Sequence, residues 1–215
     1  MADHPSISGI RKVYHKFQLN EADALPDPIR QFEKWWNDAL ASNPDEVNAM
    51  TIATCDKQGN PSARTVLLKA IHDDGFVFYT NYESRKGKEL IANPSVALLF
   101  FWRELERQVR VEGRASKISP EESDAYFITR PVESRLGAWT SPQSQVIPGR
   151  DFLENREKEI ESKFSGKEIP RPDFWGGFIV VPKRIEFWQG RPGRLHDRLL
   201  YSKEDGLWKI ERLAP

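Results

Sequence analysis

The sequence lacks the features that mark secreted, membrane-spanning or metal-dependent proteins. It has a single cysteine, Cys55, so no internal disulfide can form, and this usage is typical of a reducing compartment. No apolar run approaches the length of a membrane span, and the N-terminal residues lack the apolar region of a signal peptide. The four histidines show no metal-ligand spacing. We therefore expect a soluble, cytoplasmic protein without a metal site.

Nucleotide-binding and hydrolase signatures are missing as well. The thirteen glycines form no Gly-rich phosphate loop or dinucleotide fingerprint, and the chain has no GxSxG elbow. Lys plus Arg and Asp plus Glu number 32 each, so the chain has none of the positive excess of a dedicated polyanion binder. Basic residues that gather locally in a neutral chain favour a phosphorylated small molecule as the ligand.

The chain does contain enough apolar material for a core of its own. Its 215 residues include seven Trp, twelve Phe and five Tyr, and a chain of this length buries roughly 70 % of its unfolded surface.

Residues 1–24 are polar and lack periodicity, which predicts a flexible N-terminal arm. We expect residues 25–215 to form a single domain. Cys55 falls in a predicted strand, where a buried inert thiol is favoured over a nucleophile.

Hydrophobic periodicity and turn residues predict a mainly β fold with peripheral helices. Asp27 and Pro28 begin the first expected helix, and Asn43–Pro44 ends it. Helices are expected at 28–42, 84–92, 119–129 and 151–164, with a long loop at 137–150.

The expected strands are short and mostly joined by hairpins. They lie at 49–55, 62–71, 76–80, 95–102, 108–118, 178–181, 185–188, 199–202 and 207–210. The strand at 95–102 is nearly all apolar and is expected to be buried on both faces. About nine antiparallel strands of this kind close most economically into a β-barrel.

A first basic cluster spans the strand at 62–71 and the helix at 84–92. Arg64 and Lys69 bracket an apolar run, and Arg85 and Lys86 follow Ser84, the predicted N-cap. A helix N-terminus carries partial positive charge, so two cations there are mildly destabilising unless an anion binds. A phosphate site explains the arrangement; on local grounds, a solvated basic turn does too. Strand parity places Arg64 and Lys69 on opposite faces unless a bulge intervenes, which predicts separate roles for them.

A second basic cluster occupies the loop at 190–198. In this loop His196 lies between Arg194 and Arg198, and it is the histidine best suited to move or orient a proton. The alternative interpretation is that His196 is a structural histidine of the turn, with its hydrogen bonding satisfied by Asp197.

Three further segments carry candidate ligand contacts. Tyr126, Arg130 and Ser134 are spaced by four and would line one side of a cleft if the chain stays compact there. The loop at 137–150 includes Trp139, Gln143 and Ser144, and long loops in compact domains are often functional. A basic and aromatic patch, 11–14, lies in the N-terminal arm, where a solvated segment is the simpler local explanation.

The chain resembles the pyridoxamine 5′-phosphate oxidase family in an ordered set of motifs. They are RTVLLK at 64–69, YT at 79–80, SRK at 84–86, QS at 143–144, EFWQG at 186–190 and RLHDR at 194–198. Any one of them is weak, but their order and spacing hold from about Arg11 to the C-terminal RLAP. Members of the family are FMN-containing homodimers, so the resemblance implies an antiparallel FMN-binding split β-barrel.

The resemblance also implies residue roles. FMN would be held by Arg64, Val66, Leu67, Lys69, Tyr79, Thr80, Arg85, Lys86 and Gln108, and the partner subunit would add Gln143, Ser144, Trp188 and Arg198. The substrate phosphate would be held by Lys69, Tyr126, Arg130 and Ser134. Arg194 and His196, the implied catalytic residues, would approach the pyridine ring from the other chain. Arg11 and Tyr14 would close over that ring.

The implied reaction converts pyridoxamine 5′-phosphate and pyridoxine 5′-phosphate to pyridoxal 5′-phosphate. Hydride passes from the substrate C4′ carbon to the flavin, O2 then accepts the electrons and becomes hydrogen peroxide, and the imine formed from an amine substrate is hydrolysed to the aldehyde. Two other interpretations stay open: another split-barrel flavin oxidoreductase, and a non-enzymatic flavin, pyridoxal phosphate or RNA-binding protein. The RLHDR motif argues against the first, and the neutral charge argues against RNA. We expect no nucleic-acid or membrane partner.

Overall fold

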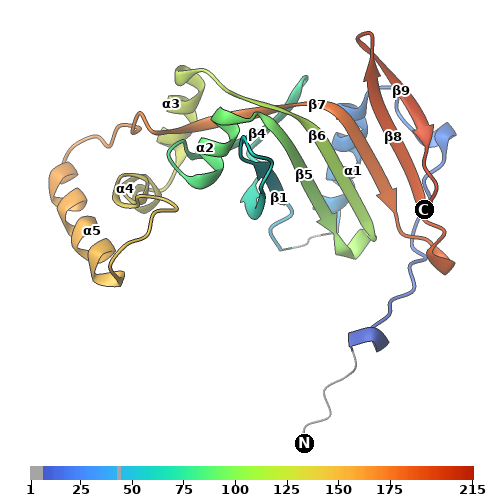
Figure 1. Cartoon of the computed structure of the whole chain (residues 1–215), viewed down its shortest axis with the longest axis horizontal. Coiled ribbons are helices and arrows are strands. Elements are labelled where there is room, and N and C mark those ends of the chain that lie inside the picture. Colours follow the sequence, from blue (N-terminus) through green and yellow to red (C-terminus); the bar gives the residue numbers. More distant parts are fainter. Residues whose placement is uncertain (1–6, 43–44) are drawn as a thin grey trace, which may run out of the picture. The chain divides into compact units, whose positions relative to one another are not determined.

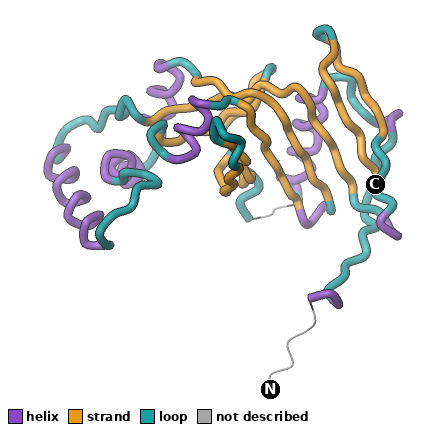
Figure 2. Tube along the Cα trace, viewed as in Figure 1, coloured by secondary structure: helices purple, strands orange, loops and turns teal. Residues whose placement is uncertain are grey.

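The computed structural model of the chain describes residues 7–42 and 45–215 (Figure 1). Within these residues it contains five α-helices and nine β-strands (Figure 2). The helices are α1 Pro28–Ala41, α2 Arg85–Ala92, α3 Pro120–Thr129, α4 Val132–Thr140 and α5 Arg150–Phe164. The helix end expected at Asn43–Pro44 and the first six residues of the expected arm lie outside the described residues.

The strands form one sheet, which confirms the mainly β fold expected from the sequence. They are β1 Ala49–Cys55, β2 Pro61–Leu67, β3 Ala70–His72, β4 Gly75–Asn81, β5 Ser95–Trp102, β6 Arg107–Lys117, β7 Trp175–Gln189, β8 Asp197–Glu204 and β9 Leu207–Arg212. Their order is β2-β1-β5-β6-β7-β4-β3, with β8 paired to β7 and to β9. The pairs β1–β2, β3–β4, β4–β7, β7–β8 and β8–β9 are antiparallel.

Helix α1 begins where the sequence predicted. The Asp27 carboxylate accepts the backbone N–H groups of Ile29 at 2.7 Å and Arg30 at 3.1 Å, so it satisfies two of the free donors at the helix start. The buried face of the helix includes Ile29, Phe32 and Trp35. Burying side chains of this size stabilises the fold by roughly 1.5–3 kcal/mol each.

The chain divides into two compact units. Unit 1 comprises Met1–Val47, Leu99–Val111 and Lys183–Pro215, and unit 2 comprises Asn48–Leu98 and Glu112–Pro182. In unit 1 the Phe32 ring packs on Phe100 with 4.9 Å between ring centroids. In unit 2 Phe78 stacks on Phe178 at 5.8 Å. Strands β5, β6 and β7 contribute residues to both units.

The single strand expected at 62–71 is wrong, because the chain changes its pairing partner there. Strand β2 pairs with β1 and ends at Leu67, and β3 pairs with β4. Between them the Leu68 N–H donates to the Asn48 carbonyl at 2.8 Å, whereas the Lys69 N–H donates to the Val77 carbonyl at 2.9 Å. Alternate residues share a face of the sheet only within an unbroken strand. The rule therefore does not relate residues on one side of this break to residues on the other side.

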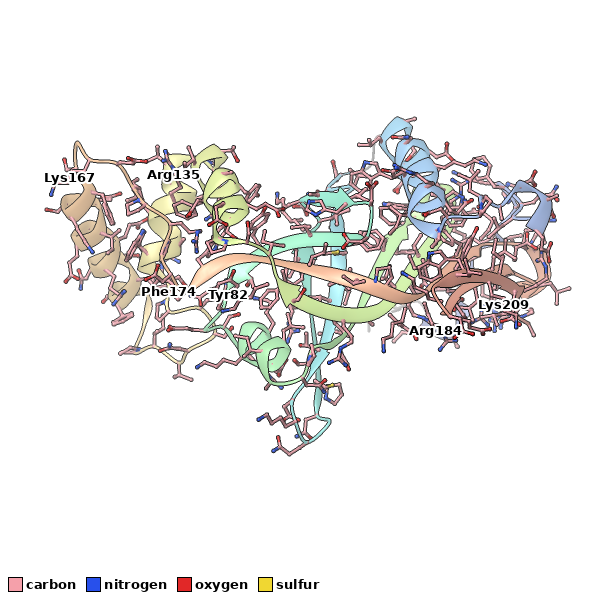
Figure 3. All side chains as sticks on the ribbon, turned by 90° about the horizontal axis from the view of Figure 1, so that it is seen from above. Tyr82, Arg135, Lys167, Phe174, Arg184 and Lys209 are labelled. Carbon is pink, nitrogen blue, oxygen red and sulfur yellow. The ribbon has the colours of Figure 1, made fainter. Side chains whose placement is uncertain are left out.

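The two strands expected at 178–181 and 185–188 are one strand, β7. Its first half pairs with β4 through Val180, and its second half pairs with β8 from Arg184 onward. Pro182 lies between these paired stretches, so its missing N–H removes no bond from either register. At the start of β7 the Phe174 carbonyl accepts the Tyr82 N–H at 2.6 Å, and the two residues lie close together in Figure 3.

Two other expectations are also wrong. Strand β5 is not buried on both faces: Leu98 and Phe100 are fully buried, but Phe101 is 51 % exposed. The loop expected at 137–150 begins as helix, because α4 extends to Thr140. Trp139 of α4 packs on Phe164 of α5 at 5.4 Å, and this contact provides tertiary support that the local pattern does not reveal.

Candidate functional site

Unit 2 contains a cavity of about 540 Å³, which we call cavity A. Its volume lies within the range of small-molecule sites, about 300–1,000 Å³. Eleven residues that the sequence singled out line it: Arg64, Val66, Leu67, Lys69, Tyr79, Thr80, Lys86, Tyr126, Arg130, Ser134 and Gln143. Cavity A therefore brings together most of the first basic cluster and all of the Tyr126, Arg130 and Ser134 set.

Arg64 and Lys69 line this same cavity although parity placed them on opposite faces. The break between β2 and β3 is the physical reason, because it lets Lys69 follow the β4 pairing rather than the β1 pairing. The expectation of opposite faces is wrong. Their separate roles stay a prediction.

Lys86 enters cavity A from the first turn of α2. Ser84 caps this helix as predicted, because its hydroxyl accepts the Gly87 N–H at 3.2 Å. The Lys86 Nζ donates to Thr80 Oγ1 and to Gln143 Oε1, both at 3.0 Å. Burial, followed by the nearby charge of Arg64, lowers the pKa of Lys86 to about 8. Gln143, for which the resemblance implied a role across subunits, thus contacts a cation of its own chain.

A stack of aromatic rings forms one wall of cavity A. Tyr79 lies 3.8 Å from Tyr126 and 5.5 Å from Trp175, measured between ring centroids, and the rings are nearly parallel. Burial, with a smaller effect of the Glu122 carboxylate, raises the pKa of Tyr79 to about 12. Tyr79 is therefore a neutral phenol at physiological pH and offers a flat, partly apolar surface.

Arg130 supplies a cation on the α3 side of cavity A. Its guanidinium lies over the Trp175 ring at 4.5 Å, and burial lowers its pKa without removing its charge. The Arg130 Nη1 is buried and has no hydrogen-bond partner among the described residues. Because an unsatisfied buried charged donor is costly, this atom indicates an anionic ligand.

Unit 1 contains a second cavity, cavity B, of about 490 Å³. Arg11, Tyr14, Arg194 and His196 line it, so the structure brings together the residues implied for the pyridine ring. Tyr14 packs edge-on against Trp188 at 5.7 Å, and Trp188 lies 4.6 Å from the His196 ring. The Glu106 carboxylate accepts the N–H groups of His15 at 2.8 Å and Lys16 at 3.1 Å, and so holds this part of the arm.

The structure shows what His196 contacts in its loop, whereas its role with a proton stays a prediction. Its Nδ1 accepts the Arg191 N–H at 3.1 Å, so the neutral ring carries its proton on Nε2. Burial first, and then the charges of Arg194 and Arg198, lower the pKa of His196. The interpretation in which Asp197 holds the His196 ring by a hydrogen bond is wrong. The Asp197 carboxylate instead accepts hydrogen bonds from the Leu19 N–H and from Arg212 Nη1.

Five of the residues to which the resemblance gave a role do not line either cavity. Arg85 pairs with Glu89 at 2.8 Å, and Arg198 donates to Glu186 at 2.8 Å and to the Ala214 carbonyl at 2.6 Å. Ser144 has a positive φ of 69°. The other two are Gln108 and Trp188.

Sequence reasoning missed several lining residues of cavity A: Thr65, Thr129, Pro131 and Trp175. Only Trp175 had a usable pattern, since it precedes the pair Gly176 and Gly177. In the structure a Cβ atom at these positions would lie 2.1 Å from Tyr82 Oη and 2.3 Å from Ile118 Cδ1, respectively. No group of His, Cys, Asp and Glu that could hold a metal ion occurs among residues 7–42 and 45–215. None of the helices described here is long and apolar enough to cross a membrane.

Comparison with family models and solved structures gives consistent matches. Residues 37–164 match the model of pyridoxamine 5′-phosphate oxidase, and residues 175–215 match the pyridoxine 5′-phosphate oxidase C-terminal dimerisation region. The structure of PhzG from Burkholderia lata 383, in complex with tetrahydrophenazine-1-carboxylic acid, has a TM-score of 0.88 and 30 % identity, covering 94 % of this chain and 99 % of that chain. A pyridoxamine 5′-phosphate oxidase-related, FMN binding protein from Nostoc punctiforme shares the fold at a TM-score of 0.69 and 19 % identity, covering 86 % of this chain and 97 % of that chain.

Curated relatives match along nearly their whole length. The pyridoxine/pyridoxamine 5′-phosphate oxidase of Cupriavidus taiwanensis is 57 % identical over 210 residues, or 97 % of this chain and 99 % of that protein. The enzyme of the same name from Rubrobacter xylanophilus is 57 % identical over 209 residues, with 97 % and 96 % covered.

The nine-stranded sheet and its likeness to these structures define a protein of the split-barrel class. The two family models and the curated relatives then give the narrower assignment. The chain belongs to the pyridoxamine 5′-phosphate oxidase family.

Proposed function

We propose that this chain is an FMN-dependent oxidase that converts pyridoxamine 5′-phosphate and pyridoxine 5′-phosphate to pyridoxal 5′-phosphate, with O2 reduced to hydrogen peroxide. The observation that carries the proposal is cavity A, where cations from β2, from α2 and from the end of α3 surround an aromatic wall. A flavin and a pyridine substrate together bring two phosphates and two flat rings. Cavity A offers partners for both kinds of group.

FMN fits the side of cavity A formed by β2 and α2. Arg64 offers a guanidinium fork, and Lys86 lies at the N-terminus of α2, where phosphate groups are favoured. Val66 and Leu67 would border the flavin ring beside Tyr79 and Thr80. Lys69 would lie between the flavin ring and the substrate. The bound flavin supplies the two-electron chemistry.

Several FMN contacts of this proposal lie outside the lining of cavity A. Arg85 and Gln108 would complete the set from the same chain. Gln143 of the same chain already lines cavity A. The site would be closed by three residues from the other chain: the partner's Ser144, the partner's Trp188 and the partner's Arg198. The dimerisation region at 175–215 supports a homodimer in which this sharing takes place.

The substrate phosphate fits the α3–α4 side of cavity A. The main support is the Nη1 of Arg130, which has no partner in the described part of the chain and which an incoming phosphate oxygen would satisfy. Tyr126, Ser134 and Lys69 line the same cavity and supply further donors.

Cavity B supplies the groups proposed to act on the pyridine ring. Arg194 and His196 would approach it from the partner subunit, with Arg11 and Tyr14 closing over it. The lowered pKa keeps His196 neutral at pH 7, with a proton on Nε2 that it can donate. We also propose that residues 25–215 work as one domain with residues 1–24 as an arm, and that the protein works in the cytoplasm.

The test is turnover of the FMN-loaded protein with pyridoxamine 5′-phosphate. We expect peroxide and aldehyde in equal amounts, and we expect Arg194→Ala to lose turnover while it keeps FMN. Lys209→Ala, which removes an exposed cation of β9 (Figure 3), serves as the control and should keep full activity. A yellow protein that oxidises only other anionic substrates would contradict the substrate assignment. A protein that cannot be loaded with FMN would contradict the flavin assignment too.

A further inference from the structure

A buried carboxylate lies behind the cations of cavity A. Glu89 of α2 is 7 % exposed and is not among the residues that line the cavity. Its Oε2 accepts hydrogen bonds from Thr54 Oγ1 at 2.5 Å and Ser62 Oγ at 2.6 Å, and its Oε1 accepts from Arg85 Nε at 2.8 Å. A buried carboxylate is costly unless it is fully partnered, and Glu89 meets that condition.

The same two hydroxyls also hold Arg64. Its Nη1 donates to Thr54 Oγ1 at 2.5 Å, its Nη2 donates to Ser62 Oγ, and Nη2 lies 3.5 Å from Glu89 Oε2. An arginine can only donate and an ionised carboxylate can only accept. Each hydroxyl therefore accepts a hydrogen bond from Arg64 and donates its single proton in a hydrogen bond to Glu89, so the direction of the bonds that link Arg64 to Glu89 is set.

We infer that Glu89 is a positioning residue that holds the Arg64 guanidinium ready for the phosphate of FMN. This inference rests on the proposed function, because that function makes Arg64 a phosphate ligand. Glu89 acts through Arg64 and through the hydroxyls of Thr54 and Ser62, without touching the ligand itself. A guanidinium that is fixed in advance loses less freedom when the anion binds, and this raises affinity for the phosphate.

A simple charge argument predicts the opposite effect. Glu89 carries a negative charge near the proposed phosphate site, so its removal should strengthen FMN binding if only through-space repulsion mattered. The two accounts therefore differ in the sign of the effect. They also differ in ligand dependence, because riboflavin lacks the phosphate and should not respond to the position of Arg64.

The experiment measures the affinity of the apoprotein for FMN and for riboflavin by quenching of flavin fluorescence. We expect Glu89→Ala to bind FMN at least ten-fold more weakly, with riboflavin affinity changed less than about two-fold. Glu89→Gln keeps an acceptor oxygen for the hydroxyls, so it should recover part of the loss. The exposed Glu83→Gln is the control: it removes a charge close to α2 and should leave FMN affinity within about two-fold.

A double-variant cycle with Arg64→Ala completes the test. If Glu89 acts through Arg64 and not through Arg85, which it also holds at 2.8 Å, Glu89→Ala should cause no further loss of FMN affinity when Arg64 is already absent. Tighter FMN binding by Glu89→Ala, or an equal loss for FMN and riboflavin, would overturn the inference alone. If Arg64→Ala itself kept the preference for FMN over riboflavin, the assignment of the phosphate site would fail instead. If Glu89→Ala does not fold, the same comparison of FMN with riboflavin is made on Glu89→Gln. An unchanged preference of that variant for FMN over riboflavin would overturn the inference.

Discussion

Raising the pH should weaken FMN binding through Lys86. The pKa of this lysine is about 8 in the ligand-free chain because of burial and the charge of Arg64, compared with an ordinary value of 10.5. An FMN phosphate beside Lys86 would favour the protonated form of this lysine and return its pKa toward the ordinary value. Binding above pH 8 must then take up a proton, and linkage makes the affinity fall as that proton becomes scarce.

The expected size follows from these two values. Lys86 is mostly protonated at pH 7, but a group with a pKa of about 8 is only about one part in eleven protonated at pH 9. If the bound state keeps the proton, the dissociation constant for FMN rises about ten-fold between pH 7 and pH 9. The phosphate stays a dianion over this range, because its second pKa is about 6.

Flavin fluorescence titrations at pH values from 7 to 9 measure this effect. Riboflavin should show little pH dependence, since it brings no phosphate to Lys86. Lys86→Met should bind FMN more weakly at pH 7 and should lose the pH slope. A flat FMN affinity in the wild-type chain, or an unchanged slope in Lys86→Met, would refute the reasoning.

Three other predictions concern stability. Phe32→Ala removes a fully buried ring of unit 1 and should lower the free energy of unfolding by about 3–5 kcal/mol in urea titrations; a loss below about 1 kcal/mol would contradict the packing described. Gly113→Ala would place a Cβ atom 2.3 Å from the Val181 carbonyl oxygen and should destabilise by about 1–3 kcal/mol, whereas Gly137→Ala, in open space on α4, should stabilise by about 0.5–1 kcal/mol. For Glu89, burial alone raises the pKa, but hydrogen bonds from Ser62, Thr54 and Arg85 lower it to about 2, below the value of 4.5 expected when unfolded. Its stabilising effect is therefore present above pH 4.5 and disappears as the pH falls toward 2, so the stability gap between wild type and Glu89→Gln should shrink in acid urea titrations; a gap that stays constant would oppose this.

Local patterns predicted the starts of α1, α2 and α3, because one or two neighbouring residues determine them, whereas no such pattern marked the start of α4. Asp27, Ser84 and Ser119 all accept backbone N–H groups from the first turn of their helices, as their positions indicated. The capping interaction is complete within a few residues of chain, so it needs no knowledge of the rest of the fold.

The sequence patterns failed where distant strands determine the structure. Nothing between 62 and 71 reveals that Leu68 still pairs near β1 while Lys69 pairs with β4. The same holds for β7, whose continuity past Pro182 depends on a change of partner. These pairings join residues that are far apart in the sequence, so no local pattern reveals them. The alternation of side chains along a strand shows which residues share a face only as long as the strand is unbroken.

The candidate site was found largely through the resemblance, which placed eleven residues in what proved to be cavity A. The buried support of that cavity was not found. Glu89 is one of 32 acidic residues, and its position in the helix resembles that of a solvated charge. Its contacts with Thr54 and Ser62 come from strands far away in the sequence, so only the folded chain shows them.

The central claim is that each active site combines cavity A of one chain with cavity B of its partner. The most direct measurement is the activity of a purified mixed dimer, with Arg64→Ala in one chain and Arg194→Ala in the other. In such a dimer one site carries both changes and the other carries neither. The claim therefore predicts about half of the wild-type peroxide release with pyridoxamine 5′-phosphate, although either homodimer alone is nearly inactive. A mixed dimer as inactive as its parents would contradict the claim, because it would mean that both cavities of a site belong to one chain.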